Sequence, residues 1–167
     1  MPHPVPPNMP EPPLVAARDR LDFYHSRATA VARDLDPAEA WDIIMAEPMP
    51  LLRWAFRIRD TLSAPFGVTP SGGFSGARGV APVEGEMLDF FLVERYAPGL
   101  LVLTARDTHL DVMTAVTTGG GQVAITTSVV THNLFGRVYM GPVAPAHGLI
   151  VRGMLARVRA GAAAVSP

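Results

Sequence analysis

The chain has 167 residues, of which 49% are hydrophobic and 17% are charged, so it is long and apolar enough to form one domain with its own core. Its net charge of −1, with basic residues scattered along the chain, argues against nucleic acid as a partner, and the lack of cysteine excludes disulfides, thiolate catalysis and cysteine metal sites. We see no secretory signal and no apolar run near the roughly 20 residues that cross a bilayer, so we expect a cytoplasmic bacterial protein without membrane insertion.

The chain begins with a proline-rich segment. Seven prolines lie within residues 1–13, a composition typical of disordered or polyproline segments. We therefore predict a disordered tail over residues 1–20, a single domain over residues 21–160 and a flexible C-terminus over residues 161–167.

One strand and two short helices are expected next. Residues 21–31 mix aromatic and small side chains and predict a first strand. In "LDPAEAWDIIM", Asp36 is a natural N-cap, Pro37 suits the first helical position and Glu39 completes a capping box. The apolar face of "PLLRWAFRIRDTL" predicts a second helix over residues 50–62. The glycine-rich "TPSGGFSGARG" that follows lacks the lysine of a phosphate-binding loop and is interpreted as a connector.

Two hairpins follow. Residues 87–96 and 100–105 are rich in strand-forming residues and flank Ala97-Pro98-Gly99, where Pro-Gly favours a type II turn. Residues 109–118 and 122–132 flank three consecutive glycines and predict a second hairpin.

The apolar period becomes helical after the last strand. We predict a helix over about Pro145–Arg159, with Pro142 and Pro145 producing a kink or a separate first turn. The element order indicates an α+β fold with an antiparallel sheet. It is also the order of the START-like helix-grip architecture, in which a curved antiparallel sheet surrounds a long C-terminal helix, with two short helices after the first strand. An apolar cavity often remains between sheet and helix in that architecture.

Two segments carry a family resemblance. "ARDTHLDVMTAV" and "THNLFGRVYMGPVAPAHGLIVRGML" resemble the two signatures of a bacterial family called domain of unknown function 2867, over about residues 28–158. The residues that match the pattern are Asp107, His109, Leu110, Asp111, His132, Asn133, Gly136, Arg137, Tyr139, Pro145, His147, Ile150 and Leu155. Ala146 departs from it, because the pattern has an aromatic residue beside the histidine, and this change enlarges a pocket or removes a packing contact. The resemblance implies a START-like fold and a functional link to a nucleotide-binding reductase, and it implies no activity.

The Asp107, His109 and Asp111 run is the most polar of the predicted strands. In a regular strand these three side chains point to the same face. The outer two would be roughly 13 Å apart, too far to share one ion, so we predict no metal and no cofactor. His109 and Asp111 either form a polar pair on the sheet or orient a polar group of a ligand at the mouth of the cavity.

The second signature holds two histidines and an arginine. His132 ends the last strand, Asn133 is a natural cap for the turn that follows, and Gly136 allows close packing. Arg137 in a first helical turn requires a carboxylate partner, either Asp107 or Asp111, or else an anionic ligand. His147 lies near the apolar stripe of the last helix, where it is bonded to a carbonyl or contacts a ligand.

Three functions remain open. The first is a binding module for a small apolar or amphipathic molecule between sheet and C-terminal helix. The second is a cofactor-independent cyclase, dehydratase or isomerase that uses His109 and Asp111. The third is a structural or interaction domain with a filled core, and assembly as a homodimer also stays open. No catalytic residue is assigned, and the candidate ligand-binding residues are His109, Asp111, His132, Arg137 and His147, with Trp54, Met113, Tyr139 and Met154 as cavity walls.

Overall fold

The computed structural model describes residues 8–46, 50, 79 and 81–164. The second expected helix, the glycine-rich connector and Trp54 lie outside these residues, apart from Pro50 and Gly79 at their ends. The described elements are an antiparallel sheet, two α-helices and one short 3-10 helix (η1, Arg18–Arg20). An α+β fold with an antiparallel sheet is therefore confirmed.

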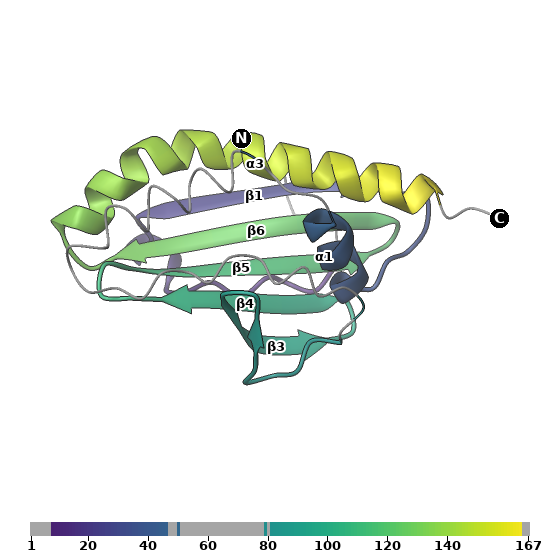
Figure 1. The fold of residues 1–167 in the computed structure, drawn as a ribbon, viewed down its shortest axis with the longest axis horizontal. Helices are drawn as coiled ribbons and strands as arrows, with labels where there is room; N and C mark the ends of the chain where they lie inside the picture. The colour runs from purple at the N-terminus through teal and green to yellow at the C-terminus, as the bar shows by residue number, and fades with distance from the viewer. Residues whose placement is uncertain (1–7, 47–49, 51–78, 80, 165–167) are drawn as a thin grey trace.

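The sheet has six strands in the order β1-β6-β5-β4-β3-β2, and every neighbouring pair is antiparallel (Figure 1). The strands are β1 (Phe23–Ala30), β2 (Met87–Leu88), β3 (Phe91–Ala97), β4 (Leu100–Arg106), β5 (Leu110–Gly119) and β6 (Gln122–Thr131). The first strand of the chain thus pairs with the last one. Both expected hairpins are present.

Glycine sets the two hairpin turns. Gly99 has a φ of +74°, as a type II turn requires of its third residue. Gly119 pairs with Gln122, so the β5–β6 turn consists of Gly120 and Gly121, with φ angles of +57° and +70°. Two consecutive left-handed residues form the turn that best matches the twist of paired strands.

The first helix, α1 (Pro37–Met45), begins as expected. The Asp36 side chain accepts a hydrogen bond from the Ala38 N–H at 2.8 Å, Pro37 occupies the first turn, and the Glu39 carboxylate accepts from the Asp36 N–H. This reciprocal pair is a capping box, and it fixes the start of the helix.

The C-terminal helix, α3 (Leu134–Ala164), begins earlier than expected and runs for 31 residues through Pro142 and Pro145. The prediction that this helix begins near Pro145 was wrong. Pro142 and Pro145 are exposed, and an exposed proline interrupts a helix less than a buried one. A proline deprives the carbonyl four residues before it of a donor, and here those carbonyls belong to the exposed residues Val138 and Gly141, where water replaces the lost bond. The helix arches over the sheet with its convex side toward solvent (Figure 1).

Asn133 begins α3. Its side-chain oxygen accepts from the Gly136 N–H at 3.0 Å, which confirms the expected cap. At the other end of α3, the Arg157 guanidinium donates to the Ile44 carbonyl at 3.3 Å and holds α1 and α3 together. Both helices therefore lie on one face of the sheet, called here the inner face (Figure 1).

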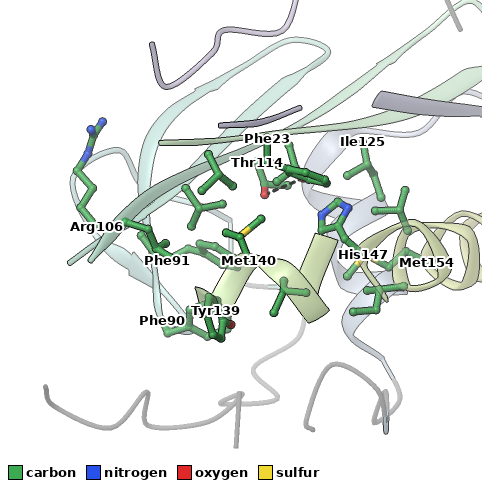
Figure 2. Close-up of a pocket in the computed structure, with 18 of the residues that line it drawn as sticks. Phe23, Phe90, Phe91, Arg106, Thr114, Ile125, Tyr139, Met140, His147 and Met154 are labelled. Carbon is green, nitrogen blue, oxygen red and sulfur yellow. Dashed lines mark hydrogen bonds between the residues drawn. The ribbon is translucent and has the colours of Figure 1, made fainter. Parts of the chain in front are cut away.

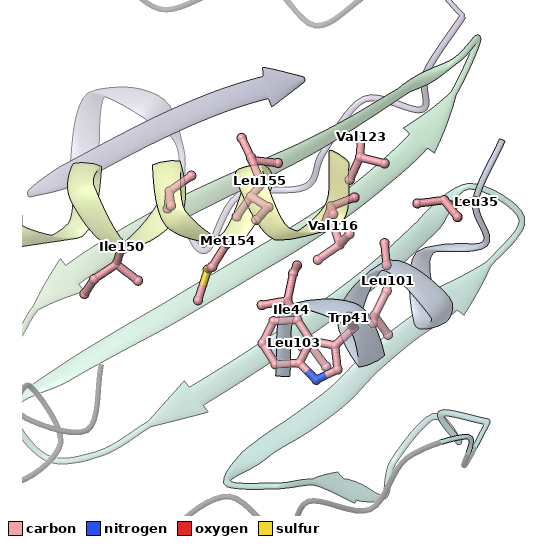
Figure 3. Packing of buried hydrophobic residues seen from close by; sticks show 14 of the residues in the cluster. Leu35, Trp41, Ile44, Leu101, Leu103, Val116, Val123, Ile150, Met154 and Leu155 are labelled. Carbon is pink, nitrogen blue, oxygen red and sulfur yellow. The ribbon is translucent and has the colours of Figure 1, made fainter. Parts of the chain in front are cut away.

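The main core lies between the inner face and the two helices (Figure 3). Leu101 and Leu103 of β4 and Val116 of β5 pack there against α3 residues such as Val151 and Leu155, all at most 3% exposed. A smaller cluster on the outer face contains Leu100, Val102, Met113 and Ala115, packed against Val15.

An N-terminal segment, residues 8–17, covers part of the outer face. The structure describes residues 8–20 of the tail expected over residues 1–20, and the segment 8–17 lies against the sheet. Met9 is buried, the Val15 N–H donates to Ser128 Oγ at 3.0 Å, and the Asn8 carbonyl approaches Gly119 so closely that an added Cβ would lie 2.7 Å from it. Among the described residues, no helix has the length and hydropathy needed to cross a membrane.

Candidate ligand cavity

A cavity of about 170 Å³ lies between the inner face and the first half of α3 (Figure 2). Its walls are mostly aromatic and aliphatic. The residues that line it are Phe23, Trp41, Met45, Phe90, Phe91, Ala105, Arg106, Asp107, Leu110, Val112, Thr114, Ile125, Thr127, Val129, Tyr139, Met140, Val143, His147, Ile150, Val151 and Met154.

Two sequence periods build these walls. Alternate residues of β5 and β6 face inward, which directs Val112 and Thr114 to the cavity from one strand and Ile125, Thr127 and Val129 from the other. The α3 side chains come from residues 139, 140, 143, 147, 150, 151 and 154, which recur at helical spacings of three and four. The cavity thus lies between alternate side chains of the strands and one face of α3.

His147 is the polar side chain of α3 that points from the helix toward the sheet (Figure 2). Its ring contacts Phe23 and His25 edge-to-face, with centroid separations of 5.2 and 5.3 Å. Its Nδ1 atom is buried without a hydrogen-bond partner among the described residues. Burial lowers the pKa of His147 to about 4, and the charge of His25 acts in the same direction, so the ring is neutral at pH 7. A neutral ring offers one donor and one acceptor.

The uncharged polar side chains of the walls also include two threonines and a tryptophan. Thr114 Oγ1 and Thr127 Oγ1 lie 3.3 Å apart across β5 and β6. Trp41 is 3% exposed, packs edge-to-face on Phe91 at 5.8 Å, and its Nε1 has no partner in the described part of the chain. Burying an N–H donor without an acceptor costs free energy that a ligand atom can recover.

Among the described residues, two charged side chains line the cavity, and both are bonded to other protein groups. The Arg106 guanidinium points away from it (Figure 2) and donates to Glu94 at 2.7 Å and to Asp111 at 3.4 Å. Asp107 Oδ1 accepts from the backbone N–H groups of His109 and Leu110 at 2.7 and 2.9 Å. Neither charge is directed at the space between sheet and helix.

The Asp107–Asp111 run is not a regular strand, contrary to the expectation. β4 ends at Arg106 and β5 begins at Leu110, and the Asp107 N–H donates to the Leu110 carbonyl at 3.0 Å across the turn between them. The side chain of Asp107 stabilises this turn, as aspartate does in Asx-turns. The three polar side chains therefore do not share a face, and Asp111 lies on the outer side with Met113, where His132 Nε2 is 3.2 Å from its carboxylate.

His109 lies where the β4–β5 turn meets the start of α3. It is 7% exposed, its ring lies 4.4 Å from that of Phe135, and its carbonyl accepts from the His132 N–H at 2.8 Å. An added Cβ at Gly136 would be 2.3 Å from that carbonyl oxygen, so only glycine fits. The expected close packing at Gly136 is confirmed, and this junction is structural.

Arg137 is exposed and does not line the cavity. The carboxylate that it acts on is Asp22, not Asp107 or Asp111 as expected. The pKa of Asp22 is lowered mainly by a backbone hydrogen bond from Thr131, and the Arg137 charge lowers it further.

A family model described as protein of unknown function (DUF2867) matches residues 17–154. The chain belongs to this family. The match covers every described residue that lines the cavity, from Phe23 to Met154, and it leaves out the N-terminal segment before Ala17. No curated protein and no solved structure matches the chain.

The sequence located part of the cavity of this DUF2867 protein. Tyr139, His147 and Met154 line it, whereas the other described candidates, His109, Asp111, His132, Arg137 and Met113, do not. An acid–base site made of His109 and Asp111 therefore gains no support from the geometry. Among the described residues, no group of three or more His, Asp or Glu is placed to hold a metal ion.

Several wall residues were not anticipated. Phe23, Trp41 and Met140 were assigned to elements but not to a site. The inward threonines, Thr114 and Thr127, had a usable signal, because they alternate with valine and isoleucine in strands already expected to form one hairpin.

Proposed function

We propose that this DUF2867 protein is a binding module that holds a small, mainly apolar molecule between the sheet and α3. One observation carries the proposal: an apolar cavity of about 170 Å³ whose polar wall atoms include a buried histidine nitrogen without a partner among the described residues. Ligand pockets generally combine apolar walls with a few convergent polar groups.

The cavity volume limits the size of the ligand. An engineered protein cavity of roughly 150 Å³ accommodates benzene, so a space of about 170 Å³ suits a molecule of about one ring. Such a ligand is smaller than a lipid. The cavity is nevertheless larger than the water-sized voids that normal packing leaves.

The arrangement of elements supports the same proposal. A curved antiparallel sheet faces one long C-terminal helix (Figure 1), and side chains of both line the cavity. We infer a helix-grip architecture of the START-like kind, in which such a space serves to hold ligands. Binding without turnover is favoured because the charged groups that line this cavity, Arg106 and Asp107, are already bonded to other protein groups.

Methionine methyl groups provide a direct test. Met140 and Met154 line the cavity, whereas Met113 lies in the outer-face cluster. In protein labelled at the methionine methyls, we expect added benzene to shift the NMR signals of Met140 and Met154 and to leave that of Met113 unchanged.

A cavity-filling variant makes the test specific. Ala105→Leu adds volume at the cavity wall, and Ala97→Leu adds the same volume to another partly buried strand alanine that does not line it. We expect Ala105→Leu to abolish the benzene-induced shifts and Ala97→Leu to retain them. Wild-type spectra without shifts at saturating benzene would indicate a filled core and contradict the proposal, and native mass spectrometry of the purified protein would then show no retained molecule.

A further inference from the structure

We propose that the ligand is an uncharged ring compound with one hydroxyl or carbonyl oxygen, held by a hydrogen bond to His147. This inference rests on the proposed function, since it specifies what the same cavity binds.

The need for an oxygen follows from the unpartnered wall atoms. His147 Nδ1 and Trp41 Nε1 are both buried without a hydrogen-bond partner among the described residues, and both residues line the cavity. Buried polar atoms in folded proteins nearly always have a partner, which protein or bound molecule supplies. A pure hydrocarbon fills the space but leaves these atoms as they are, whereas a ligand oxygen can accept from an N–H or donate to an imidazole nitrogen.

The need for a neutral ligand follows from the charges around the cavity. A buried carboxylate or phosphate requires a cation, and the guanidinium of Arg106 is directed outward to Glu94 and Asp111. A buried ammonium requires a carboxylate, and Asp107 Oδ1 already accepts two backbone N–H groups. His147 itself is surrounded by Phe23 and His25, and desolvation keeps it neutral. A charged ligand would therefore lose its hydration without gaining an opposite charge from the described residues that line the cavity.

The ring character follows from the walls. Phe23, Phe90, Phe91 and Tyr139 contribute aromatic surface on several sides of a space that suits about one ring (Figure 2). Trp41 lines it as well. Aromatic side chains pack favourably on a flat ring by offset or edge-to-face contact. A phenol or a cyclic ketone combines this shape with a single oxygen.

The test compares four ligands that share a benzene ring and differ in its substituent. Dissociation constants of benzene, phenol, benzoate and benzylammonium are measured at pH 7.5 from the methyl signals of Met140 and Met154. We expect phenol to bind at least about tenfold more tightly than benzene, as one recovered buried hydrogen bond predicts, and both ions to bind at least about tenfold more weakly than phenol.

Variants assign the oxygen to His147. His147→Phe is expected to remove the advantage of phenol over benzene while benzene still binds, and His147→Gln, which retains a donor and an acceptor, is expected to keep part of it. His132→Phe changes an exposed histidine outside the cavity and should leave all four constants unchanged. If benzene binds but phenol binds no better, or if benzoate binds best, the ligand class is wrong while the cavity remains a binding site. If none of the four binds, the proposed function itself fails.

Discussion

Polar side chains on the two sides of the sheet differ in their hydrogen bonding. On the outer face, Ser26 and Thr126 are bonded to each other at 2.8 Å, and Ser128 accepts from the Val15 N–H. Thr117 Oγ1 is an exception there, since it has no partner in the described part of the chain. Above the inner face, the side chains of His147 and Trp41 line a cavity and carry nitrogens that have no hydrogen-bond partner among the described residues. Polar groups that are bonded within the chain stabilise the fold, and polar groups left open beside a space are available to a ligand.

The covers of the two faces explain the difference. The outer face is covered by an extended segment, which follows the sheet closely enough to bring the Asn8 carbonyl against Gly119. The inner face is covered by a long rigid helix that packs mainly on β1 and β6, together with α1 over β4 and β5. The cavity lies between this helical cover and the sheet, lined by α3 side chains from Tyr139 to Met154 and by Trp41 and Met45 of α1.

The largest expected effect is that of pH on the inner face. The folded pKa of His147 is about 4 against an ordinary 6.5, so the unfolded chain binds a proton that the folded protein excludes between these values. The contribution of His147 to the free energy of unfolding is fully present above about pH 6.5. This free energy falls by about 3 kcal/mol as the pH decreases to 4, because each pKa unit corresponds to about 1.4 kcal/mol. The lowered pKa of His25, caused by burial and by Arg27, acts in the same window and direction.

Denaturant melts at pH 7 and pH 4 measure this effect. We expect His147→Phe to lose about 3 kcal/mol less than the wild type between the two pH values. Val143→Ala, a non-titrating change of the same cavity wall, should keep the wild-type pH dependence. Equal pH dependence in wild type and His147→Phe would show that the ring is not buried as described.

The next largest effect is expected at the contact between Gly136 of α3 and the His109 carbonyl in the β4–β5 turn. An alanine Cβ at position 136 would meet the backbone oxygen of His109 at 2.3 Å, so Gly136→Ala should lower the free energy of unfolding by about 2 kcal/mol, as overpacking does. Gly148 is the matched control, because it lies in the same helix and an added Cβ there contacts nothing within 4 Å. Gly148→Ala should stabilise the protein by about 0.5–1 kcal/mol. A stabilising effect at both positions would contradict the close approach of α3 to the β4–β5 turn.

The sequence was sufficient for those parts of the fold that local chemistry determines. The capping box at Asp36, the Pro98-Gly99 turn and the glycine turn after β5 each depend on neighbouring residues alone, and all three are present. The length of α3 was not predictable in this way, because the cost of Pro142 and Pro145 depends on which side of the helix faces water.

The site was less predictable for a related reason. Asp111 was expected beside the cavity because the pattern of Asp107–Asp111 predicts a strand. The turn at residues 107–109 instead places Asp111 on the outer face. A local change from strand to turn reassigns the face of each side chain in the run. His147 and Met154 belong to the helix expected over about Pro145–Arg159 and line the cavity, because a helical spacing over many residues determines a face reliably, whereas Tyr139, which also lines it, precedes that range.

A smaller effect is expected on the outer face at Ser128, the acceptor for the N-terminal segment. Ser128→Ala leaves the partly buried Val15 N–H without an acceptor and should cost about 1 kcal/mol. Hydrogen exchange at the Val15 amide should accelerate, whereas benzene-induced shifts of the Met140 methyl should not change. An unchanged Val15 exchange rate would show that the N-terminal segment does not depend on this bond.

The smallest effect is expected for the threonine pair of the inner face. Thr114→Val alone leaves the Thr127 hydroxyl without its neighbour, but Thr114→Val combined with Thr127→Val removes both hydroxyls and keeps the shape. Removing both partners of a buried hydrogen bond is nearly neutral, so the double variant should lie within about 0.5 kcal/mol of the wild type and should be more stable than the single variant.

The same double variant also tests whether the ligand oxygen is bonded to His147 or to the threonine pair. Because the cavity becomes more apolar while His147 is unchanged, benzene should bind more tightly, and phenol should keep its advantage over benzene. An advantage that disappears in the double variant would assign the oxygen to the threonine pair in place of His147. Retention of the advantage in the double variant, together with its loss in His147→Phe, would leave the histidine as the polar group that orients the ligand.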